Sequence, residues 1–134
     1  MQGSSDLGKL VLRVVLGVLI LFHGVAKLMH GTDYITGVVT AAGLPSFVAW
    51  GVYVGEVVAP ALLLLGLWTR IAAAVIALNM LFALVLVHAA ELAAINQTGG
   101  WALELQGMFL GSAIAIALLG AGRYSLAGAN GRWN

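Results

Sequence analysis

Residues 47–68 form an apolar run that contains one carboxylic acid, Glu56, near its centre. A run of this length is what an α-helix needs to cross the hydrocarbon core of a bilayer. A carboxylate at that depth costs about 3 kcal/mol even on lenient insertion scales, so acids within spans generally face a protein interior or a water-filled cavity. The run therefore predicts a membrane-spanning helix in which Glu56 has a protein partner or a ligand.

The composition of the whole chain agrees with this interpretation. Of its 134 residues, 62% are hydrophobic and 8% are charged, whereas soluble domains carry about 25% charged residues. We therefore expect one integral membrane domain that covers residues 1–134. The absence of cysteine excludes a dithiol redox centre, an iron–sulfur cluster or a thiolate zinc site made by this chain alone. A net charge of +1 without a basic cluster argues against nucleic acid as a partner.

Four apolar segments are each long enough to span the bilayer, at about residues 10–29, 47–68, 71–90 and 101–119. They predict an all-α integral membrane four-helix bundle. No small-residue cleavage site follows the first segment, so we interpret it as a retained span and not as a removed targeting peptide. The short connection before Arg70 predicts that the second and third helices are antiparallel neighbours.

The connection between the first two spans has a helical pattern of its own. Apolar side chains recur at helical spacing between Tyr34 and Ala42. Asp33 suits a helix N-terminus, and Gly43 followed by Pro45 would end the helix. We therefore expect a short interfacial helix that lies on the bundle.

The basic residues indicate the orientation of the chain. If both termini are cytoplasmic, five of the six basic residues lie on or near the inner side: Lys9, Arg13, Arg70, Arg123 and Arg132. Only Lys27 lies near the outer side, and the opposite orientation would reverse this count, against the positive-inside rule. We expect a multi-pass protein of the inner (plasma) membrane with both termini in the cytoplasm.

Ionisable side chains from all four spans gather in the outer half of this bundle. At 1.5 Å of rise per residue, Glu56 lies about 14 Å below the outer end of its span, and His23 about 9 Å below the end of the first span. Lys27, His88 and Glu104 lie within about 5 Å of the outer boundary. Because charged groups rarely face lipid, we expect these side chains to face one another or a cavity.

This convergence defines a candidate site. Glu56 and His23 are the candidate catalytic residues, because a buried carboxylate beside a histidine can exchange protons near neutral pH. The candidate ligand-binding residues share the outer end of the bundle: Lys27, Glu104, His88 and Trp101. No metal site is predicted, since the Glu-x-x-His spacing of di-metal bundles is absent.

Two further residues bear on this site. Pro60 removes the amide that would bond the Glu56 carbonyl, so we expect a kink or a water molecule at that level of the helix. Asn79, central in the third span, suits an interhelical hydrogen bond.

Structural roles are open for several of these residues. Glu56 could pair with Lys27 or with a histidine, and Lys27 could instead extend its amine to the membrane interface. Glu104 could form an ion pair with Lys27. His88 could belong to a hydrated helix end.

Several segments, in order along nearly the whole chain, form a recognisable pattern. They are Phe22-His23-Gly24-Val-Ala-Lys27, Gly43-Leu-Pro45, Glu56 with Leu65-Gly66-Leu-Trp-Thr-Arg70, Asn79-Met80, Val87-His88, Gly99-Gly100-Trp101, Glu104 and the ending Gly120-Ala-Gly-Arg-Tyr-Ser-Leu126. This pattern resembles the DoxX family of small four-helix membrane proteins, and the ending is its most specific part. The chain departs from the family pattern at two places. It has Ala127 where members often have Asp, and its residues 89–97 are not rich in Gly and Phe as in the family.

The resemblance implies a class of function. Family members are commonly labelled oxidoreductases, and some are similar to a subunit of thiosulfate:quinone oxidoreductase. Without cysteine, this chain would be an oxidoreductase subunit that lacks a thiol redox centre of its own. We therefore expect an accessory subunit that lies among membrane lipid and binds a quinone, or another lipophilic ligand, for a redox partner protein.

Two other classes of function stay open beside this one. The first is a non-catalytic membrane scaffold or chaperone for another membrane protein, as distant relatives of the family are. The second is a small proton-coupled transporter, for which four helices would require a homodimer.

Overall fold

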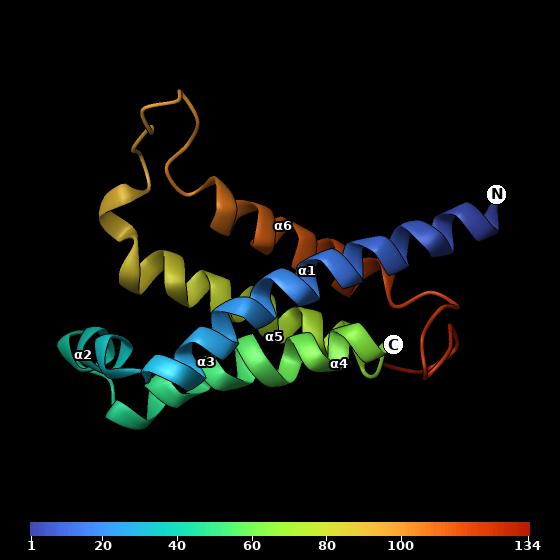
Figure 1. Cartoon of the computed structure of the whole chain (residues 1–134), viewed down its shortest axis with the longest axis horizontal. Helices are drawn as coiled ribbons and strands as arrows, with labels where there is room; N and C mark the ends of the chain where they lie inside the picture. The colour runs from blue at the N-terminus through green and yellow to red at the C-terminus, as the bar shows by residue number, and fades with distance from the viewer.

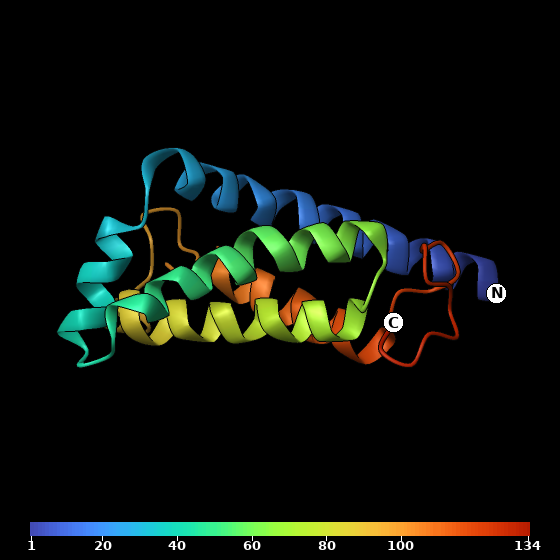
Figure 2. The ribbon, with the colours of Figure 1, turned by 90° about the horizontal axis from the view of Figure 1, so that it is seen from below.

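The computed structural model describes residues 1–134 and confirms the expected all-α fold. Its elements are α1 (Gln2–His30), α2 (Asp33–Ala41), η1 (Ser46–Trp50), α3 (Gly51–Tyr53), η2 (Val54–Val58), α4 (Ala59–Leu65), α5 (Thr69–Phe82), η3 (Ala83–Val87), η4 (Ala89–Glu91) and α6 (Glu104–Leu119). The long helices lie side by side, and both termini are at the end of the bundle opposite to α2 (Figure 1). Figure 2 shows α2 lying across the end of the bundle away from the termini, between the end of α1 and the start of the second crossing, which runs from η1 to α4.

Three continuous helical stretches are long and apolar enough to cross a membrane: Gln2–His30, Ser46–Leu65 and Thr69–Val87. The fourth helix, α6, has 16 residues, about 24 Å of length against a hydrocarbon core of about 30 Å. It begins three residues later than the sequence predicts, because Trp101 is held in the preceding loop. This residue forms an isolated bridge with Ile95, and its indole N–H donates a hydrogen bond to the Leu92 carbonyl at 2.9 Å.

The second crossing changes its helical type along its length. It begins as the 3₁₀ turn η1, continues through α3 and the π turn η2, and ends as α4. In η2 the amide of Ala59 bonds to the Val54 carbonyl, five residues back. Pro60 follows in the first turn of α4, where a missing amide is tolerated. The irregularity therefore lies at the level that Pro60 predicts, as a wide turn around Glu56.

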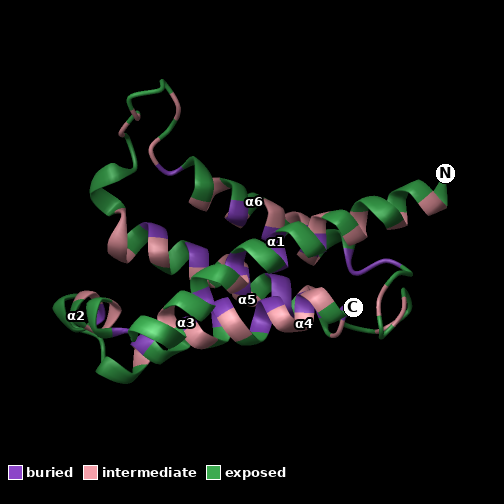
Figure 3. Cartoon of the chain, viewed as in Figure 1, coloured by how far each residue is buried: buried purple, intermediate pink, exposed green.

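The core lies where α1, α4, α5 and α6 meet. Its buried members are Leu16, Ile20, Ala59, Leu63, Ala72, Ala73, Ile76, Met80, Phe109, Ala113 and Ile116. The alanines let the helix backbones approach closely, as small residues do in membrane bundles. Buried positions line the inner faces of the helices, while the outer faces are largely exposed (Figure 3). Many exposed side chains are large and apolar, for example Phe22 at 69% and Leu118 at 73%, as expected for a surface in contact with lipid.

Polar contacts close the end of the bundle that carries the termini. The buried guanidinium of Arg13 donates hydrogen bonds to the carbonyls of Leu63 at 3.3 Å and Tyr124 at 2.5 Å. The Asn134 side chain accepts a hydrogen bond from the Thr69 hydroxyl at 2.6 Å and donates one to the Gly128 carbonyl at 2.7 Å. These bonds fix residues 120–134 against the starts and ends of the helices.

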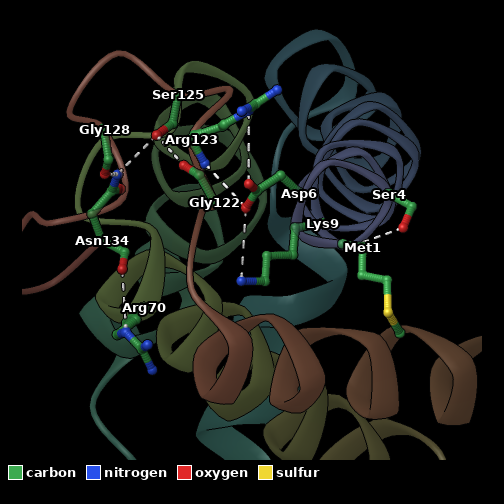
Figure 4. Close-up of polar contacts among 10 residues, drawn as sticks. All are labelled: Met1, Ser4, Asp6, Lys9, Arg70, Gly122, Arg123, Ser125, Gly128 and Asn134. Atoms are coloured by element: carbon green, nitrogen blue, oxygen red, sulfur yellow. Dashed lines mark hydrogen bonds and ion pairs between the residues drawn. The ribbon is translucent and has the colours of Figure 1, made fainter.

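The same end carries ion pairs and a second arginine. Figure 4 shows the Asp6 carboxylate between Lys9 and Arg123, with N–O distances of 4.0 and 3.8 Å. Arg70 donates to the Asn134 backbone carbonyl, as Figure 4 draws, and also to the Ala117 carbonyl.

Candidate functional site

A cavity of about 500 Å³ lies between the helices at the α2 end of the bundle. Most of its lining is apolar and comes from α1, α2, the second crossing, α5 with η3, and α6. Six polar or ionisable side chains interrupt this lining: His23, Lys27, Glu56, Asn79, His88 and Gln106. The cavity therefore combines apolar walls with a small number of polar groups, which is the usual character of a small-molecule site.

Glu56 is the centre of the polar group. Its Oε2 is 2.5 Å from the Nζ of Lys27, and its Oε1 accepts a hydrogen bond from the Nδ2 of Asn79 at 3.2 Å. The Glu56 side chain is 8% exposed and the Lys27 side chain 24%. A buried carboxylate needs such partners, because removing an unpaired charge from water costs several kcal/mol. The sequence left either Lys27 or a histidine as the partner of Glu56, and in the structure the partner is Lys27.

Two glycines allow α1, the second crossing and α5 to approach one another closely beside Glu56. A Cβ added to Gly24 in α1 would collide with the carbonyl of Glu56, and one added to Gly55 would lie 2.6 Å from the Cβ of Asn79. Only glycine permits these close approaches. Since Lys27 is one turn after Gly24, the first contact places its amine beside the Glu56 carboxylate.

The backbone geometry also sets the direction of Glu56. The π turn η2 contains both Gly55 and Glu56, and such turns insert one residue into the helical ladder and often occur at functional sites. A second π turn, η3, lies in α5's continuation and contributes Ala83 and Val87 to the same cavity. Both wide turns therefore lie around the cavity.

His23 also lines the cavity, on the same face of α1 as Lys27. Its ring packs edge-on against Phe109, with centroids 5.9 Å apart and an interplanar angle of 80°. The hydrogen bonds to Glu56 come from Lys27 and Asn79. His23 and Glu56 thus share the cavity as separate groups.

His88 lies at the rim of the cavity, directly after η3. Its Nε2 is 3.4 Å from the Nε2 of Gln106, and its Nδ1 is 3.6 Å from a carboxylate oxygen of Glu91. The His88 side chain is 26% exposed and that of Glu91 is 53% exposed. This cluster therefore lies between the cavity lining and the exposed Glu91.

Glu104 and Trp101 do not line the cavity, which corrects the expectation that they face it with the other candidates. Glu104 is the first residue of α6, and its carboxylate lies beside Gly100, while the Trp101 ring lies over Gly107. Gln106 faces the cavity instead. Two residues along a helix correspond to a rotation of about 200°, so Glu104 and Gln106 point in nearly opposite directions.

Gln106 is therefore a polar cavity residue that sequence reasoning missed. The signal for it was weak, because α6 is apolar on nearly all sides and its pattern does not indicate which side faces inward.

Comparison with known proteins assigns the chain to a family. The DoxX family model matches residues 8–89. The chain is similar to a protein of Bacillus subtilis named "Putative oxidoreductase CatD", at 36% identity over 89 residues, which is 65% of this chain and 64% of the relative. It is also similar to an uncharacterized protein of Haemophilus influenzae, at 37% identity over 79 residues, 59% of this chain and 58% of the relative. The aligned part thus spans less than two thirds of either relative.

No solved structure matches the chain. The family model covers more than half of the chain, including most of α1, the second crossing and α5 with η3, which carry the Lys27–Glu56–Asn79 group. This protein belongs to the DoxX family.

Proposed function

We propose that this protein is an accessory subunit of a membrane redox system and that its cavity binds a quinone-like lipophilic ligand. The observation that carries the proposal is the hydrogen-bonded group of Lys27, Glu56 and Asn79 inside a largely apolar cavity. Apolar walls suit a lipid-soluble ring and chain, and a few fixed polar groups can orient a carbonyl-bearing head. The volume of about 500 Å³ lies within the common range for small-molecule sites.

The ionisable residues of the cavity suit the proton chemistry of a quinone. Conversion of a quinone to a quinol takes up a pair of electrons and a pair of protons. Glu56 and His23 line the cavity and are groups that can exchange protons with a bound ligand. His88 lines the cavity and lies 3.6 Å from the exposed Glu91, and we assign proton exchange with water to this pair.

The electrons come from another protein in this proposal. The chain has no cysteine, so it offers no thiol redox centre, and we assign electron transfer to a redox partner in the membrane. Similarity to a relative whose name describes it as an oxidoreductase supports a redox setting for the chain.

The proposal includes an orientation. With both termini in the cytoplasm, the α2 end of the bundle and the cavity face the outer leaflet, and four of the exposed or half-buried basic residues lie at the inner end: Lys9, Arg70, Arg123 and Arg132.

The decisive experiment measures binding of a benzoquinone that carries a decyl chain to the purified protein in detergent. The wild type should bind it, and Glu56→Gln, which keeps the shape of the side chain, should weaken binding about tenfold or more through loss of the charge-assisted hydrogen bond to Lys27. Glu104→Gln is the matched control, because this carboxylate lies outside the cavity, and it should bind like the wild type.

Two results would contradict the proposal. The first is the absence of quinone binding by the wild type. The second is recovery of the same partner proteins at full activity by Glu56→Gln, which would favour the scaffold function.

A further inference from the structure

We infer that the cavity selects ligands whose head group is uncharged and accepts hydrogen bonds. The inference rests on the proposed function, because it concerns the ligand of the same cavity. It begins from the charges of the lining. The charged side chains there are Lys27 and Glu56, which lie 2.5 Å apart and cancel. The other ionisable groups that line the cavity are His23 and His88.

An anionic head group would meet a specific obstacle in this cavity. It would have to compete with Glu56 for Lys27, since that ammonium is the lining's one permanent positive charge. The Glu56 carboxylate, 8% exposed, would then lie buried without its counter-ion, and loss of one partner of a buried pair is strongly unfavourable. A cationic head would displace Lys27 from Glu56 with the same kind of penalty.

Donor groups that can bind a ligand remain beside the ion pair. An ammonium has three N–H groups and a side-chain amide has two. Lys27 donates to Glu56 Oε2, and Asn79 donates to Glu56 Oε1. Each oxygen of the carboxylate thus accepts one hydrogen bond, while Lys27 and Asn79 keep N–H groups that no protein atom accepts. A carbonyl oxygen is an uncharged group that matches them.

The matched probes are methyl 4-decylbenzoate and 4-decylbenzoate. They share the ring and the alkyl chain, and differ in that the ester is uncharged and the carboxylate is anionic. Binding is measured by native mass spectrometry of the purified protein from detergent micelles at about pH 8, where histidine side chains are ordinarily neutral. The decyl benzoquinone is measured in parallel.

The wild type should retain the ester about tenfold better than the carboxylate at equal free concentration, because the anion must break the Lys27–Glu56 pair. Glu56→Gln should reverse this preference, since it leaves the Lys27 charge without a counter-charge. The double variant Glu56→Gln with Lys27→Met restores a neutral lining and should again prefer the ester.

The matched controls come from a second ion pair of the same chain. Asp6→Asn and Lys9→Met remove charges of the Asp6–Lys9 pair, whose atoms lie 4.0 Å apart at the opposite end of the bundle. These variants should keep the wild-type preference.

The outcomes separate this inference from the proposed function. Equal retention of ester and carboxylate by the wild type overturns the inference while leaving a lipophilic-ligand site in place. Retention of the quinone together with loss of both benzoates also overturns it, because an uncharged carbonyl head would then be insufficient. Loss of all three probes overturns the proposed function itself. If Glu56→Gln fails to fold, the ester-to-carboxylate preference of the wild type and of the double variant still tests the inference.

Discussion

Gly24 in α1 lies directly against the backbone carbonyl of Glu56 in the second crossing, so closely that a Cβ at position 24 would overlap the carbonyl oxygen and carbon. Pro60 has no amide to offer that carbonyl in the usual helical hydrogen bond. The carbonyl is therefore directed at α1 where α1 has no side chain. This contact holds α1 against the second crossing one turn before Lys27 and so helps to set the geometry of the ion pair.

Gly24→Ala should destabilise the protein and weaken ligand binding together. The added methyl group meets backbone atoms, which cannot rotate away, so we expect a loss of about 1–3 kcal/mol, as for other overpacked sites. Thermal unfolding in detergent measures the first effect and quinone binding the second. Gly8→Ala is the control on the same helix, because nothing lies within 4 Å of its added Cβ; it should leave both quantities unchanged or raise stability slightly. Equal behaviour of the two variants would contradict the role assigned to Gly24.

Asn79→Leu should lower stability modestly and ligand affinity more clearly. The variant has a similar side-chain volume but removes the hydrogen bond to Glu56 Oε1. Interhelical hydrogen bonds in membranes contribute about 0.6 kcal/mol on average, whereas an unsatisfied buried carboxylate oxygen costs about 1–3 kcal/mol. Unfolding midpoints and quinone affinities of the same preparations check this prediction. An affinity equal to that of the wild type would show that Asn79 has no part in the site.

The positions of the helices and the Lys27–Glu56 pair follow from the sequence to a large extent. The apolar runs predict the crossings, and the depth of Glu56 together with its charge requires a partner within the bundle. The short turn after α4 returns α5 beside α4, as expected (Figure 2). In this turn Gly66 and Trp68 adopt left-handed backbone conformations, with φ of 69° and 46°.

The rotation of α6 does not follow from its sequence. Its apolar residues surround the helix, so their pattern does not distinguish a side facing the cavity from one facing lipid. The start of the helix depends on the bridge between Ile95 and Trp101, a contact between loop residues that a helical pattern does not contain. For these two reasons the sequence predicted Glu104 as a cavity residue, whereas the structure places Gln106 in the lining instead.

The orientation in the membrane can be tested with single cysteines, because the chain has none of its own. Ser4, Ala129 and Gln97 are exposed. The segments that contain Ser4 and Ala129 lie at the end with the termini, and the loop between η4 and α6, which contains Gln97, lies at the other end (Figure 1). With cytoplasmic termini, Gln97→Cys should react with an impermeant maleimide on intact cells, whereas Ser4→Cys and Ala129→Cys should react only after permeabilisation. The reverse pattern would invert the proposed orientation and move the cavity to the inner leaflet.

Arg13 should hold residues 120–134 in place through its fork of N–H groups. Arg13 is 1% exposed and donates hydrogen bonds to the backbone carbonyls of Leu63 and Tyr124, which lie in segments far apart in the sequence. Arg13→Lys keeps the charge but has no planar fork to reach both carbonyls, and a hydrogen bond from a charged group contributes about 1.5–3 kcal/mol. We expect a loss of stability in that range, measured by thermal unfolding.

A buried reporter distinguishes local release of this segment from general unfolding. Ala121 is 1% exposed, so a cysteine at this position should be protected from maleimide in an otherwise wild-type chain and should react in the Arg13→Lys background at temperatures below the unfolding transition. Because Arg13 lies at the opposite end from the cavity, quinone binding should be retained while the reporter becomes reactive. If the reporter stays protected and stability is unchanged, the bonds of Arg70 and Asn134 suffice to hold the segment, and Arg13 is not required for it.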